Sequence, residues 1–171
     1  MRYYFLFFLG LFCMLSFSQE SPFFSIARKG SIVDAQTYLQ THPNCINEVN
    51  QYKFSPLILA CYNGNEDMVN FLLNNNAEIN YISPEGTVLM AATVKGNDKL
   101  VEKLLKLKAD PNLTNEKGIT ALMYAVQFKN AKIVNLLLRY GANKLIIDAE
   151  GKTAFEYAVL SKNDEIINLL K

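Results

Sequence analysis

The sequence contains few of the residues from which catalytic and metal sites are usually built. Its 171 residues include one His, three Cys and no Trp. So small a number of imidazoles and thiols leaves few ways to assemble a His/Cys metal site. Serine-hydrolase motifs, Cys–His pairs, zinc motifs and glycine-rich phosphate loops are also absent. The composition therefore favours a non-enzymatic protein with no metal ligands and no cofactor.

An excess of charge of one sign is also lacking. Lys and Arg total 17 and Asp and Glu total 16, which gives a formal net charge of +1. Because nucleic-acid binding normally needs a basic face, the sequence predicts no nucleic-acid partner. Half of the residues are apolar and 19% are charged, as in a globular domain with a sizeable core.

The few candidates for catalysis have structural explanations. His42 lies in a Thr-His-Pro-Asn segment with no Cys, Asp or Glu at the spacing of metal ligands. Several carboxylates fall near the starts of expected helices, where they stabilise the helix dipole: Asp34, Glu66, Asp67, Asp98, Asp164 and Glu165. An enzyme or a small-ligand-binding protein remains an alternative, and it would require a deep pocket with convergent polar groups.

Residues 1–18 are predicted to be a secretory signal peptide. Arg2 precedes an uncharged apolar run over residues 3–15, and Ser16 and Ser18 supply the small residues of a cleavage site. The run is shorter than the roughly 20 residues that a membrane-spanning helix needs. We therefore expect export to a periplasm or secretion, without a membrane anchor after cleavage; an uncleaved N-terminal anchor is the alternative. A composition rich in Asn, Lys and Ile favours a bacterial source.

The mature chain, residues 19–171, would carry 16 basic and 16 acidic residues, because Arg2 is the only charged residue removed. It would keep two cysteines, Cys45 and Cys61. We expect Cys45 in a loop and Cys61 within a helix, farther apart than the roughly 7 Å between Cα atoms that a disulfide allows. An exported compartment would permit a bridge, but this placement predicts none.

The mature chain repeats itself. Five similar segments begin at positions 34, 32, 33 and 33 residues apart: Ser21, Ser55, Thr87, Thr120 and Thr153. A large apolar residue recurs two positions later, at Phe23, Leu57, Leu89, Leu122 and Phe155. A small residue follows in the last four segments, at Ala60, Ala92, Ala125 and Ala158. Internal periods of this length are typical of solenoid proteins.

Each repeat is expected to form two helices. Ser55, Thr87 and Thr120 precede apolar runs and are expected to cap the first helix. Gly64 and Gly96 are expected where that helix ends, since Gly readily adopts the left-handed conformation of a C-terminal cap. A second apolar run follows in each repeat. Because neither helix can bury its apolar face alone, the sequence predicts an all-α solenoid in which neighbouring repeats share one core.

This pattern resembles the ankyrin repeat. The second segment reads Ser55-Pro56-Leu57, then Gly64-Asn65 and Leu72-Leu73, and later segments contain Ala109-Asp110-Pro111-Asn112 and Gly141-Ala142-Asn143. The resemblance implies about five helix-turn-helix repeats joined by β-hairpin-like loops, over residues 21–49, 50–80, 81–112, 113–145 and 146–171. The first and last would be caps, the last closed by Ile166, Ile167, Leu169 and Leu170.

The sequence departs from the family pattern at two kinds of position. Lys129 and Lys162 replace the glycine that ends the first helix, at a cost on the order of 1 kcal/mol each. The family's histidine is absent from every repeat, and its place is taken by Phe24, Ile58, Met90, Met123 and Glu156. The inter-repeat hydrogen bonds of that histidine are therefore missing or replaced.

A basic run in the third repeat has a structural explanation. It contains Lys95, Lys99, Lys103, Lys106 and Lys108. Most of these residues fall on the second helix, where Glu102 can pair with Lys106 four residues later. We therefore expect a solvated outer face, with a patch for an acidic partner as the alternative.

The resemblance implies that another protein binds the concave face, meaning the hairpin tips and the exposed sides of the first helices. Its residues would be Tyr52, Phe54, Tyr62, Asn63, Glu85, Val94, Lys95, Lys117, Ile119, Gln127, Phe128, Lys152 and Leu160. Phe54 and Ile119 could instead fold back over neighbouring hairpins. A monomeric, non-catalytic interaction module is expected. One alternative is an inhibitor or immunity protein that blocks an enzyme or toxin, and another is a secreted effector.

Overall fold

The computed structural model describes residues 20–171, so the predicted signal peptide lies outside the described part of the chain. Within residues 20–171 the regular elements are ten α-helices and one short 3-10 helix, with a single isolated bridge between Ser83 and Gly86. None of the helices described is both long enough and apolar enough to span a bilayer. The predicted all-α class is confirmed.

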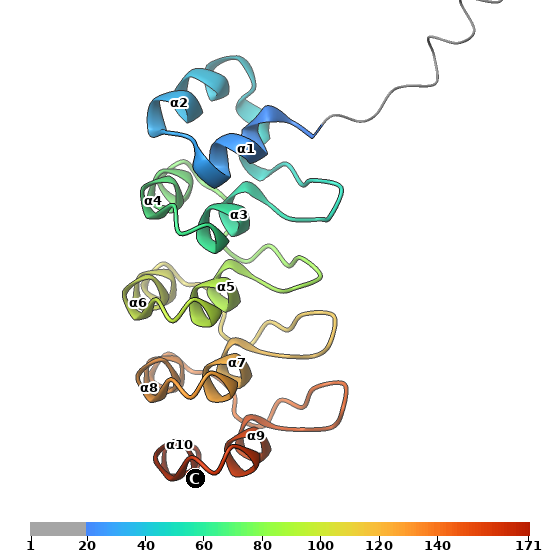
Figure 1. Ribbon diagram of the computed structural model, residues 1–171, viewed down its shortest axis with the longest axis vertical. Coiled ribbons are helices and arrows are strands. Elements are labelled where there is room, and N and C mark those ends of the chain that lie inside the picture. Colours follow the sequence, from blue (N-terminus) through green and yellow to red (C-terminus); the bar gives the residue numbers. More distant parts are fainter. Residues whose placement is uncertain (1–19) are drawn as a thin grey trace, which may run out of the picture.

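The helices form five antiparallel pairs that stack along one axis (Figure 1). The inner helices are α1 (Pro22–Lys29), α3 (Pro56–Tyr62), α5 (Val88–Val94), α7 (Ala121–Gln127) and α9 (Ala154–Leu160). The outer helices are α2 (Ile32–Thr41), α4 (Glu66–Asn74), α6 (Asp98–Lys106), α8 (Ala131–Arg139) and α10 (Asp164–Leu170). The 3-10 helix η1 (Pro43–Asn47) follows α2. Hairpin-shaped loops project from the inner helices on one side of the stack.

Side-chain caps start the helices of both rows. The predicted caps of the inner helices are confirmed, since the hydroxyls of Ser55, Thr87 and Thr120 each accept a hydrogen bond from the backbone N–H three residues later. Outer helix α2 is capped by Ser31. The other four outer helices begin with asparagine caps that sequence reasoning missed, at Asn65, Asn97, Asn130 and Asn163. Each asparagine lies directly after the turn residue of its repeat, which leaves the two helices of a pair antiparallel.

That turn residue adopts a left-handed backbone conformation in four repeats. The φ angles of Gly64 and Gly96 are 71° and 68°, and those of Lys129 and Lys162 are 55° and 51°. The two lysines therefore occupy the predicted glycine position without glycine's conformational freedom. A side chain in this conformation is strained, because Cβ approaches the following carbonyl oxygen.

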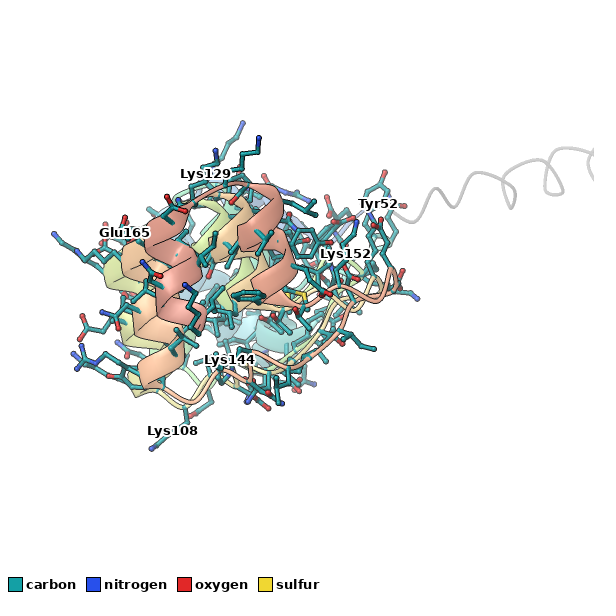
Figure 2. The ribbon with its side chains drawn as sticks, turned by 90° about the horizontal axis from the view of Figure 1, so that it is seen from below. Tyr52, Lys108, Lys129, Lys144, Lys152 and Glu165 are labelled. Atoms are coloured by element: carbon teal, nitrogen blue, oxygen red, sulfur yellow. The ribbon has the colours of Figure 1, made fainter. Side chains whose placement is uncertain are left out.

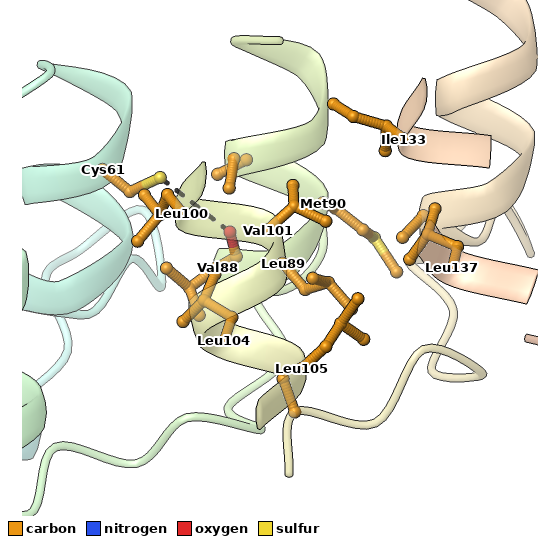
Figure 3. Close-up of a cluster of buried hydrophobic side chains, with 14 of the residues drawn as sticks. Cys61, Val88, Leu89, Met90, Leu100, Val101, Leu104, Leu105, Ile133 and Leu137 are labelled. Atoms are coloured by element: carbon orange, nitrogen blue, oxygen red, sulfur yellow. Dashed lines mark hydrogen bonds between the residues drawn. The ribbon is translucent and has the colours of Figure 1, made fainter. Parts of the chain in front are cut away.

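The core runs without interruption from repeat to repeat (Figure 3). Its centre includes Val88 and Leu89 from α5 and Leu104 and Leu105 from α6. Ile58, Met90 and Met123, which stand at the family's histidine position, are fully buried among these apolar side chains. Apolar packing therefore replaces the hydrogen bonds that a histidine would make there.

Among residues 20–171, Cys45 and Cys61 are not joined by a disulfide. Cys61 is buried on α3, and its thiol contacts the carbonyl oxygen of Val88 at 3.9 Å (Figure 3). Cys45 lies in η1 and is partly buried. Burial raises the pKa of the Cys61 thiol to about 12, so this side chain remains a neutral core residue at physiological pH.

The sequence predicted that apolar residues of the last helix close the end of the solenoid, and the end face formed by α9 and α10 differs from this prediction. Ile166 and Leu170 are buried in the core and do not cover this face. Phe155 and Val159 are exposed there instead, whereas Leu122, which is equivalent to Phe155, is buried beneath the next helix pair. The expectation was wrong for Ile166 and Leu170 because these are the residues that α10 buries where it packs against α9 and α8.

Two lysines of the basic run in the third repeat contact neighbouring polar groups. The amino group of Lys106 lies 2.8 Å from the carboxylate of Glu102, as predicted. Lys103 donates a hydrogen bond to Asn70 of the preceding repeat. Both lysines lie on the outer helix α6, and Lys103 joins it to the preceding repeat.

Replacing Lys129 or Lys162 with Gly should raise the free energy of unfolding by about 1 kcal/mol each, because the left-handed conformation then loses its steric cost. Urea unfolding followed by circular dichroism would measure the change. Lys129→Ala removes the same amino group but keeps Cβ, so it should give no gain. Equal stability of the Gly and Ala variants would contradict the steric explanation.

Candidate functional site

The predicted binding residues lie along one side of the solenoid. They occupy the hairpin tips and the C-terminal ends of the inner helices. Figure 2, viewed along the stack, shows Tyr52 and Lys152 on the hairpin side and Glu165 on the opposite side. Tyr52, Phe128 and Leu160 are 63%, 55% and 65% exposed, respectively. Asn63, Glu85, Lys95, Lys117 and Gln127 are also exposed, whereas Phe54, Tyr62, Val94, Ile119 and Lys152 are half-buried.

Phe54 and Ile119 were the two residues that could either face a partner or fold back over neighbouring hairpins. Both pack against the hydrophobic core. The ring of Phe54 meets the ring of Tyr62 edge-on, with centroids 6.3 Å apart and planes at 89°. This contact fixes the orientation of Tyr62, which remains half-exposed. Phe54 and Ile119 therefore support the hairpins from beneath and contribute only part of their surface to the concave face.

A buried polar side chain anchors each hairpin from inside. The Oδ1 atom of Asn115 accepts hydrogen bonds from the backbone N–H groups of Lys117 and Ile119, both at 3.0 Å. Asp148 accepts from Glu150 and Lys152 in the same way, each at 2.9 Å. The equivalent positions hold Asn50, which makes the same pair of bonds, and Ser83, which donates to the Gly86 carbonyl.

Two of these anchors also hold a tyrosine of the following inner helix. The Nδ2 group of Asn115 donates to the hydroxyl of Tyr124 at 3.0 Å. The hydroxyl of Tyr157 donates a short hydrogen bond to Asp148. Sequence reasoning missed both the anchors and these tyrosines. The available signal was a polar residue at positions 50, 83, 115 and 148, in register with the repeat.

Hydrogen bonds also connect successive hairpins. The hydroxyl of Tyr81 donates to the carbonyl oxygen of Lys53 at 2.9 Å. The N–H groups of Glu116 and Ala149 donate to the carbonyl oxygens of Pro84 and Lys117 at 3.4 and 2.9 Å. Each hairpin tip is thus held both by its own anchor and by its neighbour. A surface ordered before binding loses little conformational entropy when a partner binds.

The charges on the last hairpin are mutually stabilised. The hydrogen bond from Tyr157, together with those from the backbone of Lys152 and Glu150, lowers the pKa of the Asp148 carboxyl below its ordinary 3.8. The same bond to Asp148 raises the pKa of Tyr157 to about 12. Lys152 pairs with Glu150, and its amino group lies 5.7 Å from the centroid of the Tyr157 ring.

Possible metal sites and surface hollows can be located among residues 20–171. Among residues 20–171, no three His, Cys, Asp or Glu side chains are grouped so that they could hold a metal ion. One hollow, of about 180 Å³, lies between the second and third repeats and is lined by Cys61, Glu66 and Lys95, among others. Two larger hollows, of about 690 and 420 Å³, lie beside Leu39 and Phe71 and beside Phe155 and Lys171. Their volumes fall in the range of roughly 300–1,000 Å³ that is usual for small-molecule sites. His42 stacks on Tyr38 with ring centroids 4.5 Å apart, a packing role.

Comparison with known proteins gives a family match over most of the chain. A family model described as "Ankyrin repeats (3 copies)" matches residues 8–83 and 88–171. The chain is 35% identical over 82 residues to "Ankyrin repeat, SAM and basic leucine zipper domain-containing protein 1" of Echinops telfairi, which covers 45% of this chain and 17% of that protein. It is 40% identical over 81 residues to "Ankyrin repeat and SAM domain-containing protein 6" of Rattus norvegicus, covering 46% and 9%. The chain therefore spans less than a fifth of the length of these relatives.

Asp148→Asn should reduce the sensitivity of the fold to acid. Because the folded state lowers the pKa of Asp148, the ionised carboxyl stabilises the fold above about pH 4, and this contribution is lost as pH falls through the lowered pKa. An amide cannot titrate, yet it preserves the two backbone hydrogen bonds, as Asn115 shows. Urea unfolding at pH 7 and pH 3 should give a smaller difference for Asp148→Asn than for the wild type. An unchanged difference would show that the anchor contributes no acid sensitivity.

Proposed function

Since this chain belongs to the ankyrin-repeat family, we propose that it binds another protein through its concave face and performs no catalysis itself. The observation that carries this proposal is the ordered set of hairpins, each held by a buried anchor and by its neighbour. Because its hairpins are already held in place, the concave face can recognise a folded surface without changing its own conformation.

The energetic centre of the proposed interface is aromatic and aliphatic. Tyr52, Phe128 and Leu160 are exposed on a face whose other residues are largely polar. Aromatic side chains dominate the energy of many protein interfaces, and truncating an interface hot spot typically costs about 2 kcal/mol or more. Charged residues at the hairpin tips, such as Lys117, would form a solvated rim that favours specificity over affinity.

We also propose that the mature protein acts outside the cytoplasm, in a periplasm or after secretion. The support for this is the apolar segment between Arg2 and Ser16, together with the small residues that follow it. In such a compartment a rigid binding face is equally suited to a scaffold and to an inhibitor that blocks one enzyme or toxin. The identity of a captured partner separates these two alternatives.

A monomeric state is supported by Glu156. Its counterparts Ile58, Met90 and Met123 are buried beneath the next repeat, whereas Glu156 is exposed on the end face. Its carboxylate accepts hydrogen bonds from the backbone N–H and the hydroxyl of Thr153. Stacking a second copy on this face would bury that charge, which is costly unless the charge is paired. Glu156 thus disfavours end-to-end association of the exposed Phe155 and Val159.

Binding through the concave face is tested with matched triple variants of residues 19–171. The first variant replaces Tyr52, Phe128 and Leu160 with Ser. The second variant also introduces Ser, at Val33, Leu107 and Tyr140, which are exposed away from the concave face. In pull-downs from an envelope extract of the source organism, the wild type and the second variant should retain a partner that the first loses, with affinity weakened about 30-fold or more. Circular dichroism checks that both variants fold. Loss of the partner only with the second variant, or equal capture by all three, would contradict the proposal.

Glu156→Met should promote self-association, because the end face then resembles the buried faces inside the solenoid. Sedimentation velocity at increasing protein concentration would detect dimers or longer assemblies in this variant but a monomer in the wild type. Glu165→Met makes the same chemical change on the outer surface of α10 and should remain monomeric (Figure 2). A monomeric Glu156→Met protein, or a wild type that is already dimeric, would show that Glu156 does not control association.

A further inference from the structure

A hollow of about 690 Å³ lies between the outer helices α2 and α4, away from the concave face. These helices are neighbours in the outer row, on the side of the stack opposite the hairpins (Figure 1). The hollow is lined by Gln36, Leu39, Gln40, Phe71, Asn74 and Asn75. Because four of these six side chains are carboxamides, we call it the amide hollow.

Helical spacing brings the lining residues together. Those of α2 begin at Gln36 and recur three and four positions later, so they share one face of that helix. Those at the end of α4 begin at Phe71 and recur at the same spacing. Each helix therefore contributes two amides and one apolar side chain to the same hollow.

The amides are accessible to a ligand. Gln36, Gln40 and Asn74 are exposed to solvent. Asn75 is also exposed, and its Nδ2 group donates a hydrogen bond to the carbonyl oxygen of Phe71 at 2.8 Å. The Oδ1 atom of Asn75 takes no part in that bond, so it can accept a hydrogen bond from a ligand.

The corresponding position between α4 and α6 is bridged by a hydrogen bond. There the amino group of Lys103 donates to the side-chain oxygen of Asn70. In the repeat alignment, Lys103 corresponds to Phe71 and Asn70 corresponds to Gln36. A phenyl ring has no N–H group to donate, so Phe71 leaves the amide of Gln36 available for another partner.

The two apolar side chains of the hollow are held in place from beneath. Leu39 and Phe71 are half-buried and pack against the hydrophobic core. Part of each side chain therefore remains at the surface, in a fixed position beside the amides. The hollow combines an apolar floor with hydrogen-bonding groups at its sides.

This lining favours a neutral ligand that has hydroxyl groups and an apolar face. None of the six lining residues is charged, so an ionic ligand would lose water without gaining an opposite charge. A carboxamide both donates and accepts hydrogen bonds, as a hydroxyl group does. A sugar ring carries hydroxyl groups around its rim and C–H groups on its face, and the C–H face can lie against an aromatic ring.

We propose that the amide hollow binds a neutral saccharide of about disaccharide size, which suits its volume. One sugar face lies on Phe71, and the hydroxyl groups bond to amides that include Gln36 and Gln40. The hollow lies on the outer helices, so this proposal does not depend on protein binding at the concave face.

The test is a titration of the folded protein with two neutral disaccharides, maltose and N,N′-diacetylchitobiose, followed by NMR. Saturable shifts of the side-chain amide resonances of Gln36 and Gln40, and of the ring resonances of Phe71, are expected with at least one of them. Sorbitol offers hydroxyl groups without a sugar ring and should give no saturable shift. No saturable shift with either disaccharide, or an equal response to sorbitol, would overturn the proposal.

Matched glutamine variants locate the binding. Gln36→Leu and Gln40→Leu keep a side chain of similar size but remove the amide. Each should weaken binding of the responding disaccharide about threefold to tenfold, the range for losing one hydrogen bond. Gln127→Leu makes the same change at an exposed residue of the concave face and should leave the titration unchanged. Equal weakening by all three variants, or no weakening by either α2 variant, would contradict the assigned site. All three glutamines are exposed, and circular dichroism checks that the variants fold.

Failure of this proposal can be told apart from failure of the proposed function. The triple variant of Tyr52, Phe128 and Leu160 should bind the disaccharide as the wild type does, whether or not it loses a protein partner. If neither disaccharide gives a saturable shift and Gln36→Leu loses the captured partner, the hollow is part of a protein interface and the saccharide proposal is wrong.

Discussion

Every part of this structure depends on the fact that no helix pair can cover its own apolar surface. The inner helices α3, α5 and α7 are seven residues long, well below the length of about 12–15 residues at which an isolated helix becomes marginally stable. Leu57, Leu89 and Leu122 are each 1% exposed because another repeat covers them, whereas the equivalent Phe155 is 36% exposed at the end face. Each repeat therefore depends on its neighbours to bury its apolar side chains. The same packing between repeats positions the concave face.

The hairpins at the surface are also held in a defined conformation. A hairpin with no strands of its own would be a mobile loop, since a backbone without partners gains little from any one conformation. Asn50, Asn115 and Asp148 prevent this by accepting two backbone hydrogen bonds each from within the loop. Asn115 and Asp148 also reach a tyrosine on the neighbouring inner helix. The anchors that support the concave face are thus buried, whereas eight of the thirteen residues expected to contact a partner are exposed and the other five are half-buried.

The fold could be predicted from the sequence because its determinants recur in register. The apolar runs that follow Thr87 and Thr120 predict that these residues start helices, and their caps are confirmed. The hairpin anchors were missed because the residue type changes among Asn, Ser and Asp, so a search for identical residues does not reveal them. The tyrosines held by those anchors were missed with them. Ile166 and Leu170 were wrongly expected to cover the end face. The spacing of apolar residues along a helix shows that one side is apolar, but it does not show which neighbouring element that side contacts.

The exposure of Phe54 and Ile119 could not be decided from sequence either, because it depends on how closely each hairpin lies over its helix.

The same hairpins have a consequence for the history of the chain. Each contact between hairpins joins one repeat to the next through backbone carbonyl groups, which every residue has. A gene duplication or deletion of one unit of about 33 residues would leave such junctions chemically complete. Whole units can therefore be added or removed without removing the carbonyl acceptors on which these junctions depend.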